Sequence, residues 1–126
     1  MKLRKEFTFD AAHNLIRYKG ACERLHGHTY RLAVDIEGTL SDDEMVIDFC
    51  EVSSIVRENA VSLLDHAYLN DLVEQPTAEN IALWIWNRIE SPLERRNCAL
   101  SAVTVWETAT SSVVIGKEDV HARCAE

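Results

Sequence analysis

Three histidines lie in two short segments that are predicted to be strands. This arrangement constrains the fold more than any other feature of the chain. His26 and His28 are separated by one glycine, so an extended strand places both imidazoles on the same face. His13 ends a separate alternating run, Phe7–Ala12, from which it can reach that face on a neighbouring strand. We therefore expect two adjacent strands that bring the three imidazoles together.

Alternation of apolar and polar residues predicts where these strands run. Residues 2–13 and 28–38 alternate over most of their length, which is typical of half-buried strands. In the second segment, the residues expected to share one face are His28, Tyr30, Leu32, Val34 and Ile36. A polar turn follows at 41–44, after which residues 45–47 are expected to extend or resume the sheet.

Two helices are predicted after this turn. Asp48, with Glu51 three residues later, resembles a capping box, and the helix that follows should end near Leu64. Thr77 is the expected N-cap of a second helix that runs to about Ile89.

Residues 100–107 and 111–117 then read as a final strand pair joined by a short turn. The resulting order, ββααββ, predicts an α+β fold in which a four-stranded antiparallel sheet carries both helices on one face. We expect a single domain over residues 1–126. Such a sheet leaves one face and two edges uncovered, so we expect a homo-oligomer joined edge to edge, with sites between subunits.

The composition is that of an ordinary globular protein. Of the 126 residues, 47% are hydrophobic and 27% are charged. No apolar stretch approaches the roughly 20 residues needed to cross a bilayer, so no membrane association is expected. Met1–Glu6 lacks the apolar core of a secretory signal, and the four cysteines are widely spaced: Cys22, Cys50, Cys98 and Cys124. We therefore expect a cytoplasmic protein with reduced thiols.

The charge distribution narrows the class of partner. A formal net charge of −8 argues against a nucleic-acid partner, whose phosphates would need basic residues. Residues 1–31 hold seven of the 13 basic residues and three acids, so this segment is +4 and the remainder is −12. A cationic patch around the histidines suits a small anionic substrate. The alternative is a solvated charged face near the N-terminus.

The histidine cluster has the composition of a catalytic metal site. Three neutral imidazoles without a fourth protein ligand are typical of catalytic zinc with an open coordination position. Cys22 lies four residues before His26, and nearby zinc, Lys19 and Arg24 would favour its thiolate, making it a base or nucleophile. Structural zinc sites normally close with four protein ligands, so Cys22 as the fourth ligand is the alternative.

Two acidic residues elsewhere in the chain are further candidates. Asp65 precedes His66 and can orient its ring as a proton relay, although a helix-terminal histidine interacting with the helix dipole is an equal alternative. Glu107 shares an apolar strand face with Val103 and Val105, where an unpaired carboxylate is costly. A ligand with two parallel N–H donors, such as a pterin or guanine, would satisfy it; an intersubunit arginine is the competing explanation.

The sequence resembles the 6-pyruvoyl-tetrahydropterin synthase family, and most closely its queuosine-pathway branch, which forms 6-carboxy-tetrahydropterin. The matching stretches occur in family order over nearly the whole chain: Phe7–His13, Cys22–His28, Ile47–Phe49, Leu64–His66, Tyr68–Asp71, Pro76–Asn80 and Trp106–Thr108. The three residues between Cys22 and His26 resemble the bacterial branch, whereas the animal-type enzymes have a longer gap. A folate-related branch has glutamate in place of this cysteine, so Cys22 argues against it.

The resemblance implies the tunnelling fold, in which the ββααββ unit trimerises into a barrel, often stacked as a hexamer, with active sites at subunit interfaces. It implies zinc on His13, His26 and His28. It also implies a set of catalytic and substrate-binding residues: catalytic Cys22, a relay through Asp65 and His66, and Glu107 as the pterin anchor. We expect the neighbouring Thr108 and the basic Arg24 to contribute to substrate binding.

The implied reaction converts 7,8-dihydroneopterin triphosphate into 6-carboxy-5,6,7,8-tetrahydropterin, with loss of acetaldehyde and triphosphate. It is a lyase reaction that needs no external redox cofactor, because the ring is reduced as the side chain is oxidised. Two alternatives are a 6-pyruvoyl-tetrahydropterin synthase on the same fold and a non-catalytic oligomer that binds pterin or zinc.

Overall fold

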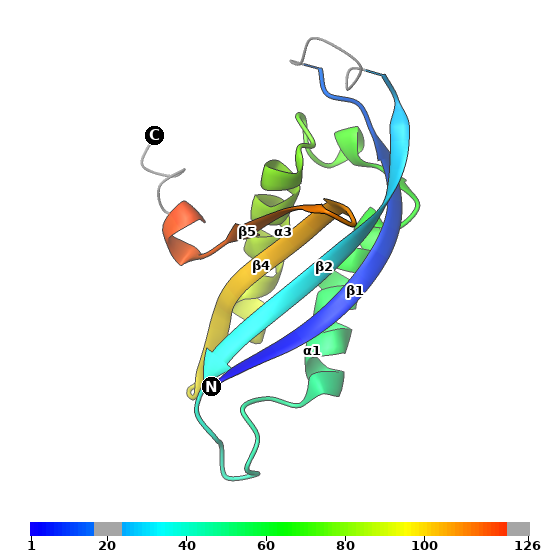
Figure 1. Cartoon of the computed structure of the whole chain (residues 1–126). Helices are drawn as coiled ribbons and strands as arrows, with labels where there is room; N and C mark the ends of the chain where they lie inside the picture. The colour runs from blue at the N-terminus through cyan, green and yellow to red at the C-terminus, as the bar shows by residue number, and fades with distance from the viewer. Residues whose placement is uncertain (17–23, 121–126) are drawn as a thin grey trace.

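The computed structural model describes residues 1–16 and 24–120, which form one curved sheet with helices packed across one of its faces (Figure 1). The four long strands are β1 (Lys2–His13), β2 (His26–Gly38), β4 (Cys98–Thr108) and β5 (Ser111–Ile115). A two-residue strand, β3 (Ala67–Tyr68), lies outside β1, so the strand order is β3-β1-β2-β4-β5.

The four long strands pair antiparallel, which confirms the predicted α+β architecture. The predicted four-stranded sheet was incomplete, because β3 adds a fifth strand that runs parallel to β1. Only two residue pairs form this addition, Ala11 with Ala67 and Ala12 with Tyr68. A two-residue strand has no alternation for the sequence to reveal, and the sheet is therefore mixed rather than wholly antiparallel.

The register of β1 and β2 brings the histidines together. His13 lies opposite His26, and Ala11 lies opposite His28, at the end of the pair where the chain leaves β1. β2 begins at His26, two residues earlier than predicted, because Gly27 interrupts the apolar alternation but still pairs with Ala12.

Residues 45–47 were expected to extend or resume the sheet, and the structure does not place them in a strand. They lie in a bend after the turn, and Val46 and Ile47 are buried in the core.

The first helical run covers 49–64 and ends at Leu64, as predicted. It comprises α1 (Phe49–Val56), a π-helical turn η2 (Arg57–Val61) and α2 (Ser62–Leu64). The Asp48 side chain caps it by accepting the Cys50 N–H at 2.7 Å. Glu51 pairs with Arg95 rather than completing the expected capping box.

A short 3-10 turn, η3 (Leu69–Asp71), leads to the second long helix, α3 (Ala78–Leu93). Thr77 is its N-cap and accepts the Asn80 N–H at 3.1 Å. The helix runs four residues beyond the predicted end at Ile89. Leu93 is fully buried, and Arg95 donates to the Pro92 carbonyl, so packing and capping stabilise a last turn that contains proline.

The core lies between the helices and one face of the sheet. The predicted stripes of β2 and α3 point into it and are almost fully buried: Tyr30, Leu32, Val34 and Ile36 from the strand, with Ile81, Ile85 and Ile89 from the helix. This core joins the β1–β2 pair to the helical layer. No helix among residues 1–16 and 24–120 is long and apolar enough to cross a membrane.

Candidate metal centre

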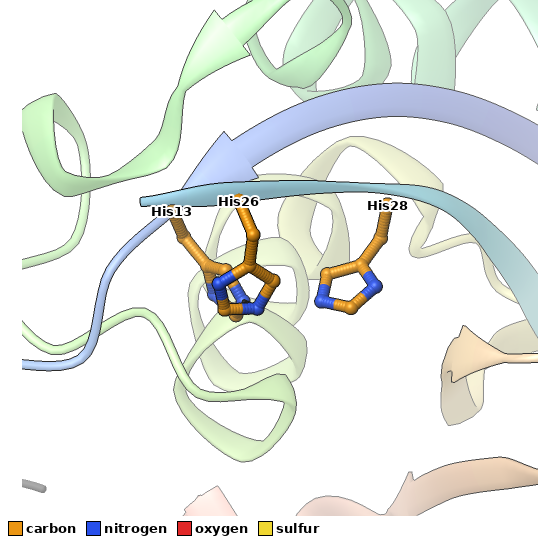
Figure 2. Close-up of side chains that lie close together, drawn as sticks. All are labelled: His13, His26 and His28. Atoms are coloured by element: carbon orange, nitrogen blue, oxygen red, sulfur yellow. Dashed lines mark hydrogen bonds between the residues drawn. The ribbon is translucent and has the colours of Figure 1, made fainter. Parts of the chain in front are cut away.

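The three predicted imidazoles meet on the helix-facing side of β1 and β2 (Figure 2). Their ligand atoms all lie within 4.8 Å of one another. His13 Nε2 is 3.1 Å from His26 Nε2. Two nitrogens bound ~2.1 Å from one tetrahedral zinc ion lie roughly 3.4 Å apart, so this spacing is close to that of a metal site.

Backbone carbonyls select the nitrogen that His13 and His26 present to the centre. His13 is buried, and its Nδ1 lies 2.7 Å from the Pro76 carbonyl oxygen. His26 Nδ1 lies 2.6 Å from the Arg24 carbonyl oxygen. Because a carbonyl only accepts, Nδ1 carries the hydrogen in both rings and Nε2 keeps its lone pair for a metal.

His28 supplies the third nitrogen of the cluster. His28 Nε2 is buried and has no hydrogen-bond partner among the described residues. Burial lowers the pKa of His28, which favours the neutral form that a metal requires. An orphaned buried nitrogen beside two correctly protonated imidazoles fits a metal ion bound by all three rings.

Tyr30 forms the inner wall of this centre, a role that the sequence did not single out. Its ring stacks on Phe9 with centroids 4.9 Å apart and meets the His28 ring edge-on at 5.5 Å. Its hydroxyl lies 3.4 Å from His13 Nδ1, and burial raises the pKa of Tyr30, so the hydroxyl stays neutral. The Tyr30 ring therefore closes the core side of the site.

Glu107 lies on β4 close to the imidazole cluster, on the strand face that its spacing from Val103 and Val105 predicted. Its Oε1 lies 3.8 Å from His28 Nε2, and its side chain is 32% exposed. Val103 and Val105, which share its face of β4, are fully buried. The carboxylate is therefore held at the boundary between the core and an open cleft.

A cleft of about 340 Å³ extends from Glu107 between the start of α3 and β5. Its lining residues are Leu15, Thr77, Ala78, Glu79, Glu107, Ser111, Ser112 and Val113. The sequence assigned no role to Pro76–Asn80 beyond the family resemblance, and the structure places Thr77, Ala78 and Glu79 in the lining of this cleft. Thr108 ends β4 and is exposed beside this cleft.

Asp65 and His66 interact directly, as predicted. His66 Nδ1 lies 3.1 Å from Asp65 Oδ2, and His66 adopts a left-handed backbone with φ of 61°. Asp10 anchors both residues: its N–H donates to Asp65 Oδ1 at 2.9 Å, and its carbonyl accepts the His66 N–H at 2.6 Å. The first of these bonds lowers the pKa of Asp65.

This pair lies on the opposite face of the sheet from the three imidazoles, because the side-chain ligand atoms of Asp10, Asp65 and His66 all lie within 4.8 Å of one another. Asp10 is three residues before His13, so their side chains leave β1 on opposite sides. Thr29 Oγ1 donates to Asp10 Oδ1 at 2.5 Å from that same open face. The chain therefore does not bring His66 to the metal-facing side of its own sheet. Cys22 lies outside the described residues, and Arg24 contributes the carbonyl that holds His26.

The sequence model described as 6-pyruvoyl tetrahydropterin synthase matches residues 2–118. The chain belongs to this family. Among curated family relatives, the 6-carboxy-5,6,7,8-tetrahydropterin synthase of Haemophilus influenzae is 35% identical, with 87% of this chain and 94% of the relative covered. The enzyme of the same name from Synechocystis is 42% identical, covering 86% and 87%.

A third family relative carries a different name. The dihydroneopterin monophosphate aldolase of Pyrococcus furiosus is 40% identical, with 79% of this chain and 83% of the relative covered. Among solved structures, 6-pyruvoyl tetrahydropterin synthase of Caenorhabditis elegans matches with a TM-score of 0.80 at 24% identity, covering 92% and 94%. That likeness supports the family fold alone.

The imidazole triad predicts a metal-binding defect that is specific to its members. His28→Ala removes a buried ligand, so the purified variant should hold far less than one zinc per subunit. His66→Ala is the matched control, because its ring lies on the other face of the sheet, and it should keep full metal content. Elemental analysis after dialysis measures both. Full metal content in His28→Ala would contradict the ligand assignment.

The Asp10–Asp65 contact predicts a pH-dependent contribution to stability. The pKa of Asp65 is lowered in the folded protein, so its ionised form stabilises the native state above the unfolded pKa of about 3.9. This contribution is lost as the pH falls through the folded pKa. Asp65→Asn should therefore lower the free energy of unfolding at pH 7 and have a smaller effect at pH 3. Urea titration at both pH values measures this, and an equal loss at both would refute it.

Proposed function

We propose that this protein is a zinc-dependent 6-carboxy-5,6,7,8-tetrahydropterin synthase of queuosine biosynthesis. Its substrate is 7,8-dihydroneopterin triphosphate, and it releases acetaldehyde and triphosphate. The observation that carries this proposal is the position of Glu107, which faces the imidazole triad at 3.8 Å and opens into the cleft beside it. The names of the Haemophilus influenzae and Synechocystis relatives support the same reaction.

The residues of the triad would hold zinc through Nε2 of His13 and His26 together with His28. When bound, zinc supplies a Lewis acid that acidifies the adjacent C–H of an oxygenated substrate side chain. The fixed Nδ1–H bonds to Pro76 and Arg24 orient two of the rings before metal arrives. Tyr30 keeps the inner side of the site dry.

Glu107 would recognise the pterin ring. A carboxylate accepts two parallel N–H bonds, and the amidine edge of a pterin donates such a pair. The ring would then lie in the cleft near Thr77 and Thr108, with its side chain directed to the metal-binding imidazoles. Arg24 and the other basic residues near the N-terminus would attract the triphosphate.

Proton transfer requires two further groups. Cys22, favoured as a thiolate by the nearby charges in sequence, would accept a proton from one side of the substrate side chain. His66, oriented by Asp65, would exchange a proton on the other side. Because His66 faces away from the triad of its own chain, we infer that it serves the site of a neighbouring subunit in a cytoplasmic trimer or hexamer.

Product analysis tests the proposed reaction. Incubation of the zinc-loaded protein with 7,8-dihydroneopterin triphosphate should yield 6-carboxytetrahydropterin and equimolar acetaldehyde, identified by mass spectrometry. Formation of 6-pyruvoyl-tetrahydropterin without acetaldehyde would assign the pyruvoyl reaction instead. Preferential consumption of dihydroneopterin monophosphate would favour the aldolase named among the relatives. No turnover of either substrate would favour a non-catalytic pterin-binding role.

Mixed oligomers test the shared active site. Cys22→Ala and His66→Ala should each lower kcat by roughly 10²-fold or more, since each removes one proton-transfer group. When the two variants are co-expressed, about a quarter of the sites in a random cyclic oligomer receive both intact residues, so activity should return to that level.

The control mixes the double variant Cys22→Ala/His66→Ala with His66→Ala, a combination in which every subunit lacks His66 and no site regains both groups. Co-expressed single variants that remain as inactive as their separate preparations would place both residues in one chain's site and refute the shared arrangement.

A further inference from the structure

Side-chain amides join the segment that follows β1 to the segment that precedes α3. The Asn70 side chain makes two of these bonds to one backbone unit. Its Oδ1 accepts the Asn14 N–H at 3.0 Å, and its Nδ2 donates to the Asn14 carbonyl at 2.7 Å. This pair continues the parallel pairing of β3 with β1 beyond the point where strand pairing stops. The Tyr68 hydroxyl adds a third bond, donating to Asn14 Oδ1.

Gln75, five residues after Asn70, makes the second connection. Its Oε1 accepts the Ile16 N–H at 2.8 Å. Its own carbonyl accepts from Asn80 Nδ2 at 2.9 Å and from the Thr77 N–H at 2.9 Å. Gln75 is therefore fixed to α3 through its backbone and to the end of β1 through its side chain.

These bonds enclose His13. Asn14 directly follows His13, and Pro76, whose carbonyl lies 2.7 Å from His13 Nδ1, directly follows Gln75. The Asn70 pair fixes the backbone that carries the ring. The Gln75 bonds fix the carbonyl that decides which ring nitrogen holds the hydrogen. Together they set both the position and the tautomer of one metal ligand.

We propose that Asn70 and Gln75 are positioning residues of the metal centre, which hold His13 with its Nε2 directed at the metal. This inference rests on the proposed metal site. Neither side chain contacts the imidazole triad itself, so each acts through Asn14 or Pro76. Groups that orient a metal-ligating histidine are worth 10- to 100-fold in metal affinity when removed, and these two amides control such a group.

Zinc affinity of the metal-free protein tests the proposal without reference to turnover. Competition with a chromophoric chelator should give a zinc Kd about tenfold weaker for Asn70→Ala and for Gln75→Ala than for the wild type. Gln75→Glu keeps an oxygen acceptor for the Ile16 N–H and should retain near wild-type affinity. A near wild-type zinc Kd for Gln75→Glu, beside a weaker one for Gln75→Ala, would show that the oxygen acceptor at this position is what matters.

Asn97→Ala is the matched control for lost stability. Asn97 is also a bridging amide, whose Nδ2 donates to the Thr39 and Val46 carbonyls at 2.8 and 2.9 Å. It lies beside the far end of β2 from the histidines, so its loss should lower Tm and leave zinc Kd unchanged. Thermal denaturation of each metal-free variant provides the comparison, and titrations are done well below the lowest Tm.

Three results would overturn the proposal, and they are distinguishable. Wild-type zinc affinity in both Asn70→Ala and Gln75→Ala would refute the positioning role and leave the metal site intact. Failure of the wild-type protein to bind zinc would refute both the proposed metal site and the positioning role that depends on it. An affinity loss in Asn97→Ala equal to that of the other two variants would show a general stability effect instead.

Discussion

The antiparallel register of β1 and β2 is the constraint on which the site depends. It sets His13 opposite His26, and it puts His28 one step along the same face. A register shift of one residue would turn a strand over and send its imidazoles to the opposite side of the sheet. The buried stripe of Tyr30 and Leu32 opposes such a shift, because each is fully buried against the helices. The hydrophobic core therefore also specifies where the three imidazoles meet.

The same period-two geometry separates the site into two halves. The imidazoles and Glu107 face the helix side of the sheet, whereas Asp65 and His66 lie beside the Asp10 side chain on the open side. A reaction that uses both halves then needs two copies of the chain, and the uncovered sheet edges offer a way to join them. Oligomerisation would in that case complete the catalytic machinery.

Patterns along the sequence predicted the long strands, both helices, the triad and Glu107, because each depends on side-chain type and spacing. Three features left no such signal. The strand β3 is too short to show alternation, and the π-helical turn within 57–61 has no distinguishing period. The carbonyls of Pro76 and Arg24 hold two imidazoles, yet every residue carries a carbonyl. Adjacency of Asp65 and His66 revealed their pairing but not the face of the sheet that they occupy.

The proposed function requires three imidazoles to bind one metal ion and to leave a coordination position open for substrate. Zinc K-edge X-ray absorption of the loaded, substrate-free protein tests it most directly. Binding through the three imidazoles should give nitrogen and oxygen neighbours at about 2.0–2.1 Å and no sulfur. A sulfur neighbour at about 2.3 Å that disappears in Cys22→Ala would show a closed site with Cys22 as the fourth ligand, and would contradict an open coordination position.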